Sequence, residues 1–255
     1  METQCSQIDS RNIKLRLRLL DSNKDLEKVI ALFADTFSRF EPLSKHLGQD
    51  RATFLPFAKS AAKRCTKESL SFVCEDISDG DRLVGFILNE TFDASETNTH
   101  SSNENEIDHC ESDDENDCDD NNQIKSLLKQ LDRQWQLQNQ ELVETERIFH
   151  IAAVGVDSDY NNLGIASKLI LASLNHAKAT GYRVVIVEAT AIATQKIFEK
   201  KYGFKAVVKQ IYDEFTYNGK NVFKGLNDPP YCILFEKYLD DWNCVQIEEC
   251  CNQAI

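Results

Sequence analysis

The 255-residue sequence predicts an α/β (α+β) fold in which helices flank a central β-sheet. Two observations carry this prediction. From residue 147 onward, strand and helix patterns alternate in the order strand, helix, strand, helix, strand. Before residue 91, a strand pattern, two helical patterns and a hairpin signal follow one another. An acidic segment and one further helical pattern connect these two parts of the chain.

The N-terminal part starts with a strand, because residues 12–20 (NIKLRLRLL) alternate apolar and basic side chains. Asp21 and Ser22 then offer N-cap oxygens to a helix over 23–38, where apolar residues recur at helical spacing. A second helical pattern covers 51–65. This part of the chain is therefore expected to open with one strand and two helices.

Glu41 and Pro42 end the first helix, because the residue before a proline is driven out of the α-helical conformation. Farther on, residues 70–75 and 83–90 have the composition of strands, and the Asp-Gly pair between them favours a tight turn. These segments predict a β-hairpin that follows the two helices.

Residues 91–122 contain twelve Asp or Glu and no Lys or Arg. Such a segment cannot bury enough apolar surface to offset its ordering entropy, so we expect a disordered acidic insertion. A calcium-binding loop is the alternative, but Ile124 stands where the closing Glu would be needed. Without these twelve charges the net charge of −13 becomes −1, and no segment offers the basic surface that nucleic acid requires.

The remaining elements come from the part of the chain after the acidic insertion. Helical periodicity resumes over 123–141, and glycines close the later helical patterns. The β-branched run RVVIVEAT is typical of a strand that is buried on both faces. The expected strands cover 147–156, 183–190, 204–212 and 231–237, and the expected helices cover 164–179 and 193–202.

Nine cysteines are scattered without the two-residue spacing of a zinc or redox motif, so we expect reduced thiols and no metal site. The first residues, METQCSQIDS, lack the apolar run of a signal peptide, and no segment reaches membrane-spanning length. These features predict a cytoplasmic protein without a membrane partner. Cys250 and Cys251 are a candidate lipidation site, although no prenylation pattern or basic cluster accompanies them.

The segment DSDYNNLGIASKL, residues 157–169, has the pattern of a phosphate-binding turn that runs into a helix. A helix N-terminus carries unpaired N–H groups and a partial positive charge, which stabilise an anion. Gly164 lets the backbone approach a ligand closely, and Ala166 keeps the helix start uncluttered. The residues of a Walker loop and of the three-glycine dinucleotide fingerprint are missing. A purely structural turn is the alternative interpretation.

The run VDSDYNNLGIASKLILASLNHAKATGYRVVIVEAT, followed by QKIFEKKYGF, resembles the acetyl-CoA-binding half of the GNAT superfamily of N-acetyltransferases. FSRFEPLSKHLG near the N-terminus is similar to the insect-type arylalkylamine (dopamine) N-acetyltransferases. The resemblance spans about residues 12–238, apart from the acidic insertion. It implies a single N-acetyltransferase domain over 12–240 with a mixed sheet, an insertion at 91–122, a tail at 241–255, and acetyl-CoA as co-substrate.

By this resemblance, the family's Arg/Gln-x-x-Gly-x-Gly/Ala loop falls on residues 161–166. Asn161 stands in its first position and cannot supply the charge-assisted contact of an arginine, worth roughly 1.5–3 kcal/mol. We therefore expect weaker cofactor binding rather than none, with Lys168 as a nearby source of positive charge. The implied cofactor-binding residues are Val154, Gly155 and Val156 for the pantetheine arm, and Asn161, Asn162, Leu163, Gly164, Ile165 and Ala166 for the diphosphate. Splaying of the next strand would seat the acetyl group.

Acetyl transfer to an amine needs a base, because an alkylammonium loses its proton only near pH ~10. The resemblance implies that Glu41, in an intact Glu-Pro-Leu motif, is this base. A solvated carboxylate at a helix end is the alternative. Thr190 and Thr194 stand where the family carries two serines. Their hydroxyls could assist the departing thiolate or cap a helix.

Three other candidates for proton transfer are weaker. The tyrosine that many family members use as an acid falls near Phe198, which has no proton to donate. Tyr202 is displaced toward the helix end, because FEKKYGF has one residue more than the commoner FEKLGF form. His46 and His150 titrate in the right range to relay protons, but most such histidines are structural.

The resemblance implies an enzyme that acetylates a small primary amine, most specifically an arylalkylamine. Four phenylalanines could line an apolar amine pocket or belong to the core, namely Phe37, Phe40, Phe54 and Phe57. Acetylation of a polyamine or of a protein amine is an alternative, and the acidic insertion would favour a polycationic acceptor. A CoA-binding module without catalytic activity is the alternative from another functional class.

Overall fold

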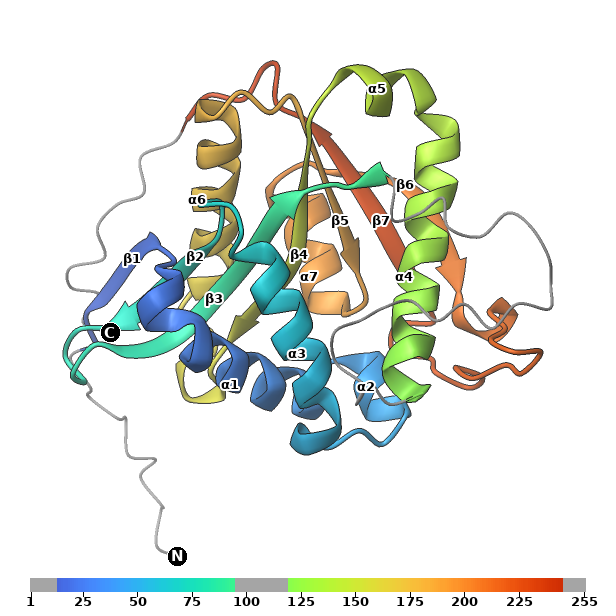
Figure 1. The fold of residues 1–255 in the computed structure, drawn as a ribbon, viewed down its shortest axis with the longest axis horizontal. Coiled ribbons are helices and arrows are strands. Elements are labelled where there is room, and N and C mark those ends of the chain that lie inside the picture. Colours follow the sequence, from blue (N-terminus) through green and yellow to red (C-terminus); the bar gives the residue numbers. More distant parts are fainter. Residues whose placement is uncertain (1–12, 95–118, 245–255) are drawn as a thin grey trace, which may run out of the picture.

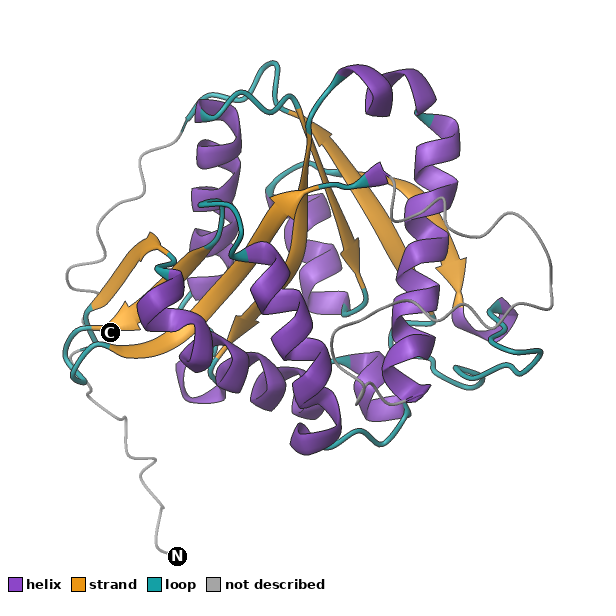
Figure 2. Cartoon of the chain, viewed as in Figure 1, coloured by secondary structure: helices purple, strands orange, loops and turns teal. Residues whose placement is uncertain are grey.

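The computed structural model describes residues 13–94 and 119–244. Within them, seven strands form one sheet, and helices cover both of its faces (Figures 1 and 2). The strands are β1 (Leu15–Leu19), β2 (Phe72–Asp76), β3 (Arg82–Thr91), β4 (Ile148–Val156), β5 (Val184–Ala189), β6 (Lys205–Ile211) and β7 (Tyr231–Tyr238). The helices are α1 (Ser22–Phe40), α2 (Pro42–His46), α3 (Arg51–Cys65), α4 (Asp119–Gln138), α5 (Gln140–Thr145), α6 (Ile165–Ala179) and α7 (Ile192–Lys196).

The sheet is mixed, and its strand order is β1-β2-β3-β4-β5-β7-β6. Every neighbouring pair is antiparallel except β4 and β5, which are parallel. A parallel pair needs a crossover connection, and α6 supplies it between β4 and β5. The predicted α/β (α+β) class and the mixed sheet are therefore confirmed.

The β4–β5 pair opens partway along its length. Only three residue pairs are in register, and the last joins His150 to Ile186. Both strands continue beyond that pair, β4 to Val156 and β5 to Ala189. The ladder between β3 and β4 is also irregular at Ala152, which is left without a partner on β3. The two central strands thus separate toward their C-terminal ends, as the family resemblance implied.

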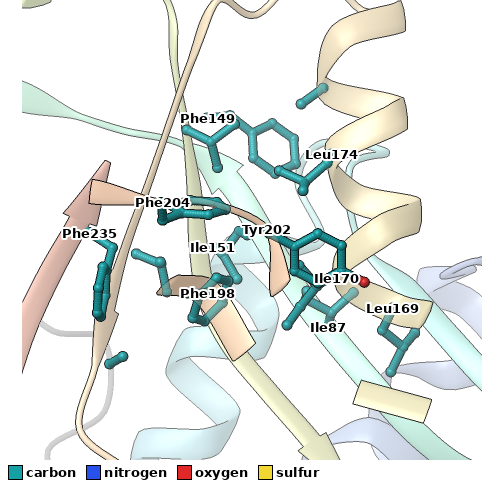
Figure 3. Packing of buried hydrophobic residues seen from close by; sticks show 14 of the residues in the cluster. Ile87, Phe149, Ile151, Leu169, Ile170, Leu174, Phe198, Tyr202, Phe204 and Phe235 are labelled. Atoms are coloured by element: carbon teal, nitrogen blue, oxygen red, sulfur yellow. The ribbon is translucent and has the colours of Figure 1, made fainter. Parts of the chain in front are cut away.

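One face of the sheet packs against α6 and against the segment that follows α7. The shared core is apolar and contains several aromatic rings. Its labelled members in Figure 3 are Ile87, Phe149, Ile151, Leu169, Ile170, Leu174, Phe198, Tyr202, Phe204 and Phe235. Burial of this cluster fixes α6 directly behind β3 and β4, with the N-terminus of α6 at the open end of the β4–β5 pair.

The opposite face carries two separate clusters. Helices α1 and α3 cover β3 and β4, whereas α4 packs over β6 and β7 (Figure 1). Gly155 allows α1 to lie close to β4, because a Cβ there would come within 2.5 Å of the Phe86 ring and 3.0 Å of Thr36 Oγ1. This close approach brings the C-terminal end of α1 to the separated strands.

The N-terminal half contains one helix that the sequence did not predict. Glu41 ends α1 as expected, with extended φ and ψ of −74° and 127°, but a new helix, α2, begins at Pro42. Five residues are too few to show helical periodicity, and Pro at the first helical position is a common start. His46 is the last residue of α2.

The predicted acidic insertion is too wide at both ends. Thr91 completes β3, and α4 begins at Asp119 rather than at residue 123. Asn121 explains the earlier start, because its side chain is buried and accepts a hydrogen bond of 3.0 Å from Gln49 Nε2. Residues 95–118 lie outside the described residues, so the disorder predicted for them stays a prediction. None of the helices described here has the length and apolar character needed to cross a membrane.

Candidate active site

A cavity of about 420 Å³ lies where β4 and β5 separate. It brings together predicted residues from distant parts of the chain. Those that line it are Glu41, Thr190, Thr194, Val154, Gly155, Val156, Asn161 and Ala166. The other predicted diphosphate residues, Asn162, Leu163, Gly164 and Ile165, lie in the same loop but not on the cavity wall.

The predicted diphosphate loop has the backbone of an anion-binding turn. Gly164 is the N-cap of α6 in the left-handed conformation, with φ of 73°, and Asn162 also has a positive φ of 64°. Glycine and asparagine are the residues that most readily adopt this conformation, which explains why an asparagine is present at position 162. The first-turn N–H groups of α6 lack acceptors within the helix and lie next to the cavity, where they suit a phosphate.

Side-chain contacts hold this loop in place from the hairpin side. The Tyr160 hydroxyl donates to Asp76 Oδ2 at 3.0 Å, and Arg82 Nη2 donates to Asp157 Oδ2 at 2.7 Å. Asn161 itself is exposed and lines the cavity. Among the described residues that line the cavity there is no Lys, Arg or His. The loop therefore presents backbone dipoles to a diphosphate without a cation on the cavity wall.

Glu41 lies at the N-terminus of α2 and lines the cavity. Its Oε1 accepts from the Leu43 N–H at 3.0 Å, and its Oε2 accepts from the N–H and hydroxyl of Ser44 at 2.6 and 2.8 Å. Burial raises the pKa of Glu41, although these hydrogen bonds and one from Thr190 oppose the shift. The carboxylate is thus both a helix cap and a group whose pKa is closer to neutrality than usual.

Thr190 and Thr194 flank the same part of the cavity. Thr190 directly follows β5, and its side chain lies near enough to Glu41 to lower the pKa of that carboxyl group. The Thr194 hydroxyl donates to the Ala191 carbonyl oxygen at 2.8 Å, which is a contact within the first turn of α7. Thr190 is therefore the better placed of the two to connect Glu41 with a reacting group. Thr194 does not cap α7, because the N-cap residue is Ala191 and the helix has no side-chain capping hydrogen bond.

A π-helical turn over Ile197–Lys201 accommodates the extra residue of the FEKKYGF segment. The Tyr202 N–H donates to the Ile197 carbonyl oxygen at 3.2 Å, five residues back along the chain. Phe198 consequently faces the cavity, whereas the Tyr202 hydroxyl contacts Ser167 Oγ and O at 2.8 and 2.6 Å (Figure 3). Burial raises the pKa of Tyr202. Neither side chain is positioned as an acid for the cavity.

Neither of the two histidines is positioned to relay a proton in the cavity. His46 is exposed in a shallower groove beside the cavity, with its ring 6.2 Å from that of Phe223. His150 is buried at the last β4–β5 pair, and both of its nitrogens contact carboxylates, Glu90 at 3.0 Å and Glu188 at 2.7 Å. Burial opposes its charge, but Glu188 and Glu90 raise the pKa of His150 well above its ordinary value. Both ring nitrogens of His150 are thus engaged by carboxylates, and the residue does not line the cavity.

The wall opposite β5 is aromatic. All four predicted phenylalanines line the cavity, and Phe33 joins them. Their rings interlock, with centroid separations such as 4.5 Å for Phe33 and Phe37 and 5.1 Å for Phe54 and Phe57. Phe33 and Phe54 are also buried in the core. Lining the cavity and packing in the core are therefore compatible roles for these phenylalanines. This wall would accommodate an aromatic ring.

Glu188 is a cavity residue that the sequence interpretation missed. It lies in the strand RVVIVEAT, where it is the one charged residue of β5. Its side chain is 5% exposed. A carboxylate within a buried apolar strand is unusual, and this pattern was the available signal.

Comparisons with known proteins agree with this fold. Residues 29–204 match the model of the acetyltransferase (GNAT) family. The fold is similar to that of arylalkylamine N-acetyltransferase 2 from Aedes aegypti, with a TM-score of 0.67, 20% identity, and coverage of 89% of this chain and 99% of that one. A mosquito arylalkylamine N-acetyltransferase-like protein 5b gives a TM-score of 0.65 and 16% identity, with 88% and 100% coverage. Drosophila melanogaster polyamine N-acetyltransferase gives 0.62 and 14%, with 88% and 100%.

Proposed function

The chain belongs to the acetyltransferase (GNAT) family, whose members use acetyl-CoA as co-substrate, and from this premise we propose that it transfers the acetyl group directly to a small primary amine. One observation carries the proposal. A single cavity at the separated β4 and β5 strands joins Glu41, Thr190 and the loop before α6 to an aromatic wall. Base, leaving-group donor, cofactor loop and acceptor pocket thus meet in one place.

Direct transfer requires both substrates to be bound together. The amine nitrogen attacks the thioester carbonyl, so that a C–N bond forms, the C–S bond breaks, and CoA leaves as a thiolate. Glu41 takes the proton that the amine must lose. Its raised pKa suits this role, because a base is most effective when its pKa approaches the working pH. Thr190, in contact with Glu41, can donate a hydrogen bond to the developing negative charge.

The residues that hold acetyl-CoA follow from the same geometry. Gly164 and Ala166 place the first-turn N–H groups of α6 at the diphosphate, and the dipole of α6 favours its negative charge. Val154 and Val156 lie on the end of β4 that is not paired with β5, where a pantetheine arm can run along the strand. Asn161 adds a polar but uncharged side chain at the loop.

The aromatic wall favours an arylalkylamine as acceptor. A cavity of about 420 Å³ accommodates a molecule of this size and stacks its ring on phenylalanine. A polyamine is the second candidate, because the charged residues that line the cavity, among those described, are the carboxylates Glu41 and Glu188. A protein amine would have to reach the same enclosed site.

A substrate panel tests the proposal. Release of free CoA from acetyl-CoA is followed with tyramine, tryptamine, spermidine and a lysine-containing peptide, and CoA binding is measured in parallel. We expect turnover with the two arylalkylamines and a higher kcat/KM for them than for the peptide. Selective use of spermidine would favour the polyamine alternative. CoA binding without turnover of any acceptor would contradict the proposal and favour a binding module.

A further inference from the structure

The turn between β2 and β3 lies against the loop that leads into α6. The last residue of β2, Asp76, pairs with the first residue of β3, Arg82. β4 ends at the same edge of the sheet, and the N–H of Asp157, which directly follows it, donates to the Val84 carbonyl oxygen at 2.8 Å. The hairpin turn and the predicted diphosphate loop are therefore neighbours in space, although they are far apart in the sequence.

Two side chains of the hairpin contact the loop at separate points. Asp76 Oδ2 accepts a hydrogen bond of 3.0 Å from the Tyr160 hydroxyl, and both side chains are buried. Arg82 Nη2 donates to Asp157 Oδ2 at 2.7 Å, and Arg82 Cζ lies 5.5 Å from the centroid of the Tyr160 ring. Burial and the hydrogen bond to Asp76 raise the pKa of Tyr160 to about 12, so the phenol keeps its proton as the donor. The Tyr160 ring is thus held by a carboxylate at its hydroxyl and by a guanidinium over its face.

Asp157 also organises the loop from within. Its Oδ1 accepts from the Asp159 N–H at 3.0 Å, and its carbonyl oxygen accepts from the Tyr160 N–H at 2.9 Å. These bonds close the short turn Ser158–Tyr160, which Asn161 follows. Asn161 lines the cavity and Tyr160 does not. The hairpin contacts therefore fix the residue that directly precedes the cavity wall.

The same hairpin sets the position of the first turn of α6. Gly85 on β3 faces Ile165, the first residue of α6, and a Cβ at Gly85 would come within 2.8 Å of Ile165 Cγ2. Glycine therefore lets the start of the helix lie directly on β3. The hairpin thus contacts the diphosphate loop on both sides, through Tyr160 before it and through Ile165 after it.

The backbone of the loop depends on such support. Asn162 and Gly164 both have left-handed conformations, with φ of 64° and 73°, and a non-glycine residue populates this region sparsely. The described residues on the cavity wall include no Lys, Arg or His, so a diphosphate would be bound mainly by N–H groups. A hydrogen bond weakens steeply when its donor is misaligned, whereas the attraction of a cation falls off gradually with distance. Affinity therefore depends on how well the loop is held before the ligand arrives.

We propose that the β2–β3 turn clamps the diphosphate loop, and that Tyr160 and Arg82 are positioning residues for the N–H groups that bind acetyl-CoA. The clamp consists of the Asp76–Tyr160 and Arg82–Asp157 contacts. None of these four side chains lines the cavity, so each acts through the loop and not on the cofactor. The inference rests on the proposed function, since it explains how an acetyl-CoA site without a cation on its wall obtains its affinity.

Removal of one hydroxyl group tests the clamp without a change of charge. Tyr160→Phe should raise the Kd for CoA and the KM for acetyl-CoA by about tenfold, the increase expected when the binding conformation falls to about one tenth of the population. At saturating acetyl-CoA, kcat and the KM for tyramine should stay within about twofold, because the bound cofactor holds the loop in place. Calorimetry and steady-state kinetics measure these quantities. An unchanged affinity for CoA would overturn the proposal.

Tyr182→Phe is the matched control. Tyr182 is buried to a similar degree as Tyr160, and its hydroxyl contacts Thr91 and Arg147 at the other end of β3. This variant also loses a buried hydroxyl group but should bind CoA with the affinity of the wild type. An equal loss of CoA affinity in both variants would come from general destabilisation and would overturn the proposal.

Asp157→Ala separates the clamp from simple electrostatics, because the two predict effects of opposite sign. If charge alone mattered, removal of a carboxylate beside the diphosphate loop would tighten CoA binding. Loss of the contact with Arg82 and of the hydrogen bond from the Asp159 N–H should instead weaken CoA binding by about tenfold. Tighter binding or an unchanged Kd would contradict the clamp.

Hydrogen exchange of the protein without cofactor gives a readout that needs no ligand. The hydrogen-bonded amides of Asp157, Asp159 and Asn161 should exchange faster in Tyr160→Phe than in the wild type, whereas those of α4 should not change. Equal exchange rates in the loop would overturn the proposal. Because affinity and exchange are measured without acetyl transfer, a failure of the clamp is distinguishable from a failure of the transferase proposal, which the substrate panel decides.

Discussion

Glu41 combines two roles that most substitutions would remove together. It caps α2 through the N–H groups of Leu43 and Ser44, and it lines the cavity with a raised pKa. A change that keeps an acceptor oxygen but removes the ability to take a proton separates them. Glutamine is that change, because its amide oxygen can still accept from a backbone N–H.

Glu41→Gln should lower kcat by about 100- to 10,000-fold, the usual contribution of a general base, with little loss of thermal stability. The carboxylate must be ionised to act, and burial raises its pKa, so kcat/KM of the wild type should fall at acidic pH from a point above the ordinary pKa of about 4.3. Steady-state kinetics between pH 5 and 9 and a melting curve check both statements. A variant that keeps the wild-type rate and acidic limb would contradict the assignment.

Asn161 is the position where the loop departs from its apparent relatives. Asn161→Arg should tighten acetyl-CoA binding by roughly tenfold or more, because it adds a charge-assisted contact next to the diphosphate. Calorimetric titration with acetyl-CoA measures the dissociation constant. Asn161→Gln is the matched control, since it lengthens the same side chain without adding a charge. An unchanged affinity in Asn161→Arg would show that the loop obtains its charge elsewhere.

The π-helical turn after α7 shows how one added residue redirects side chains along an element. It lets Phe204 and the following strand keep their place in the core while Tyr202 turns toward α6. The sequence revealed the extra residue but not its effect, because an insertion in a helix can be absorbed by a bulge, a loop or a shift of the whole element. Only packing against Ser167 decides among these outcomes.

Tyr202→Phe separates a structural hydroxyl from a catalytic one. Because the hydroxyl contacts Ser167 and not the cavity, we expect kcat within about twofold of the wild type and a loss of about 1 kcal/mol in the free energy of unfolding. Urea unfolding and the acetylation assay measure the two effects. A large fall in kcat at unchanged KM would mean that the tyrosine donates a proton after all.

Other elements show which sequence signals were sufficient. The helix α3 matches the predicted range of 51–65, because its apolar residues recur over several turns. α2 was missed because five residues carry no period, and α4 was predicted to begin four residues too late because its first turn is polar. That turn is held by Asn121 and Gln49, a pairing between residues far apart in the chain that no local pattern contains.

The candidate site was predictable to a similar extent. Glu41, Thr190 and the loop around Gly164 were found because they belong to motifs with a recognisable spacing. Glu188 was missed, since its contact with His150 forms only after β4 and β5 have assembled into one sheet. Motifs report a residue's neighbours in sequence, whereas buried charge networks are defined by neighbours in space.

The same network ties the stability of the whole molecule to pH. Burial acts against the charge of Glu90, but hydrogen bonds from His150 and Arg64 hold its pKa well below the ordinary value. A group whose pKa is lowered on folding stabilises the protein above its unfolded pKa of about 4.3, and this contribution is lost as the pH falls. The free energy of unfolding should therefore decrease from about pH 5 toward pH 3.

Glu90→Gln tests this dependence. At pH 7 the variant should be less stable by about 1.5–3 kcal/mol, because contacts between charged groups become contacts to a neutral amide. Below about pH 4 the difference between variant and wild type should narrow, because Glu90 of the unfolded wild type, with its ordinary pKa of about 4.3, then gains a proton that the folded state does not bind. Urea unfolding at several pH values measures both. A difference that does not depend on pH would mean that shape, and not charge, accounts for the loss.

Helix α4 contributes directly to the cavity. Ile124 and Leu128 form part of the cavity wall, and Asn121 secures the first turn of the helix. The cavity is therefore complete only when α4 is in place. Whatever binds there gains contacts only when α4 is docked, so ligand affinity and the docking of α4 are thermodynamically linked quantities. A modification that shifts one must shift the other by the same free energy, even when it lies outside the cavity.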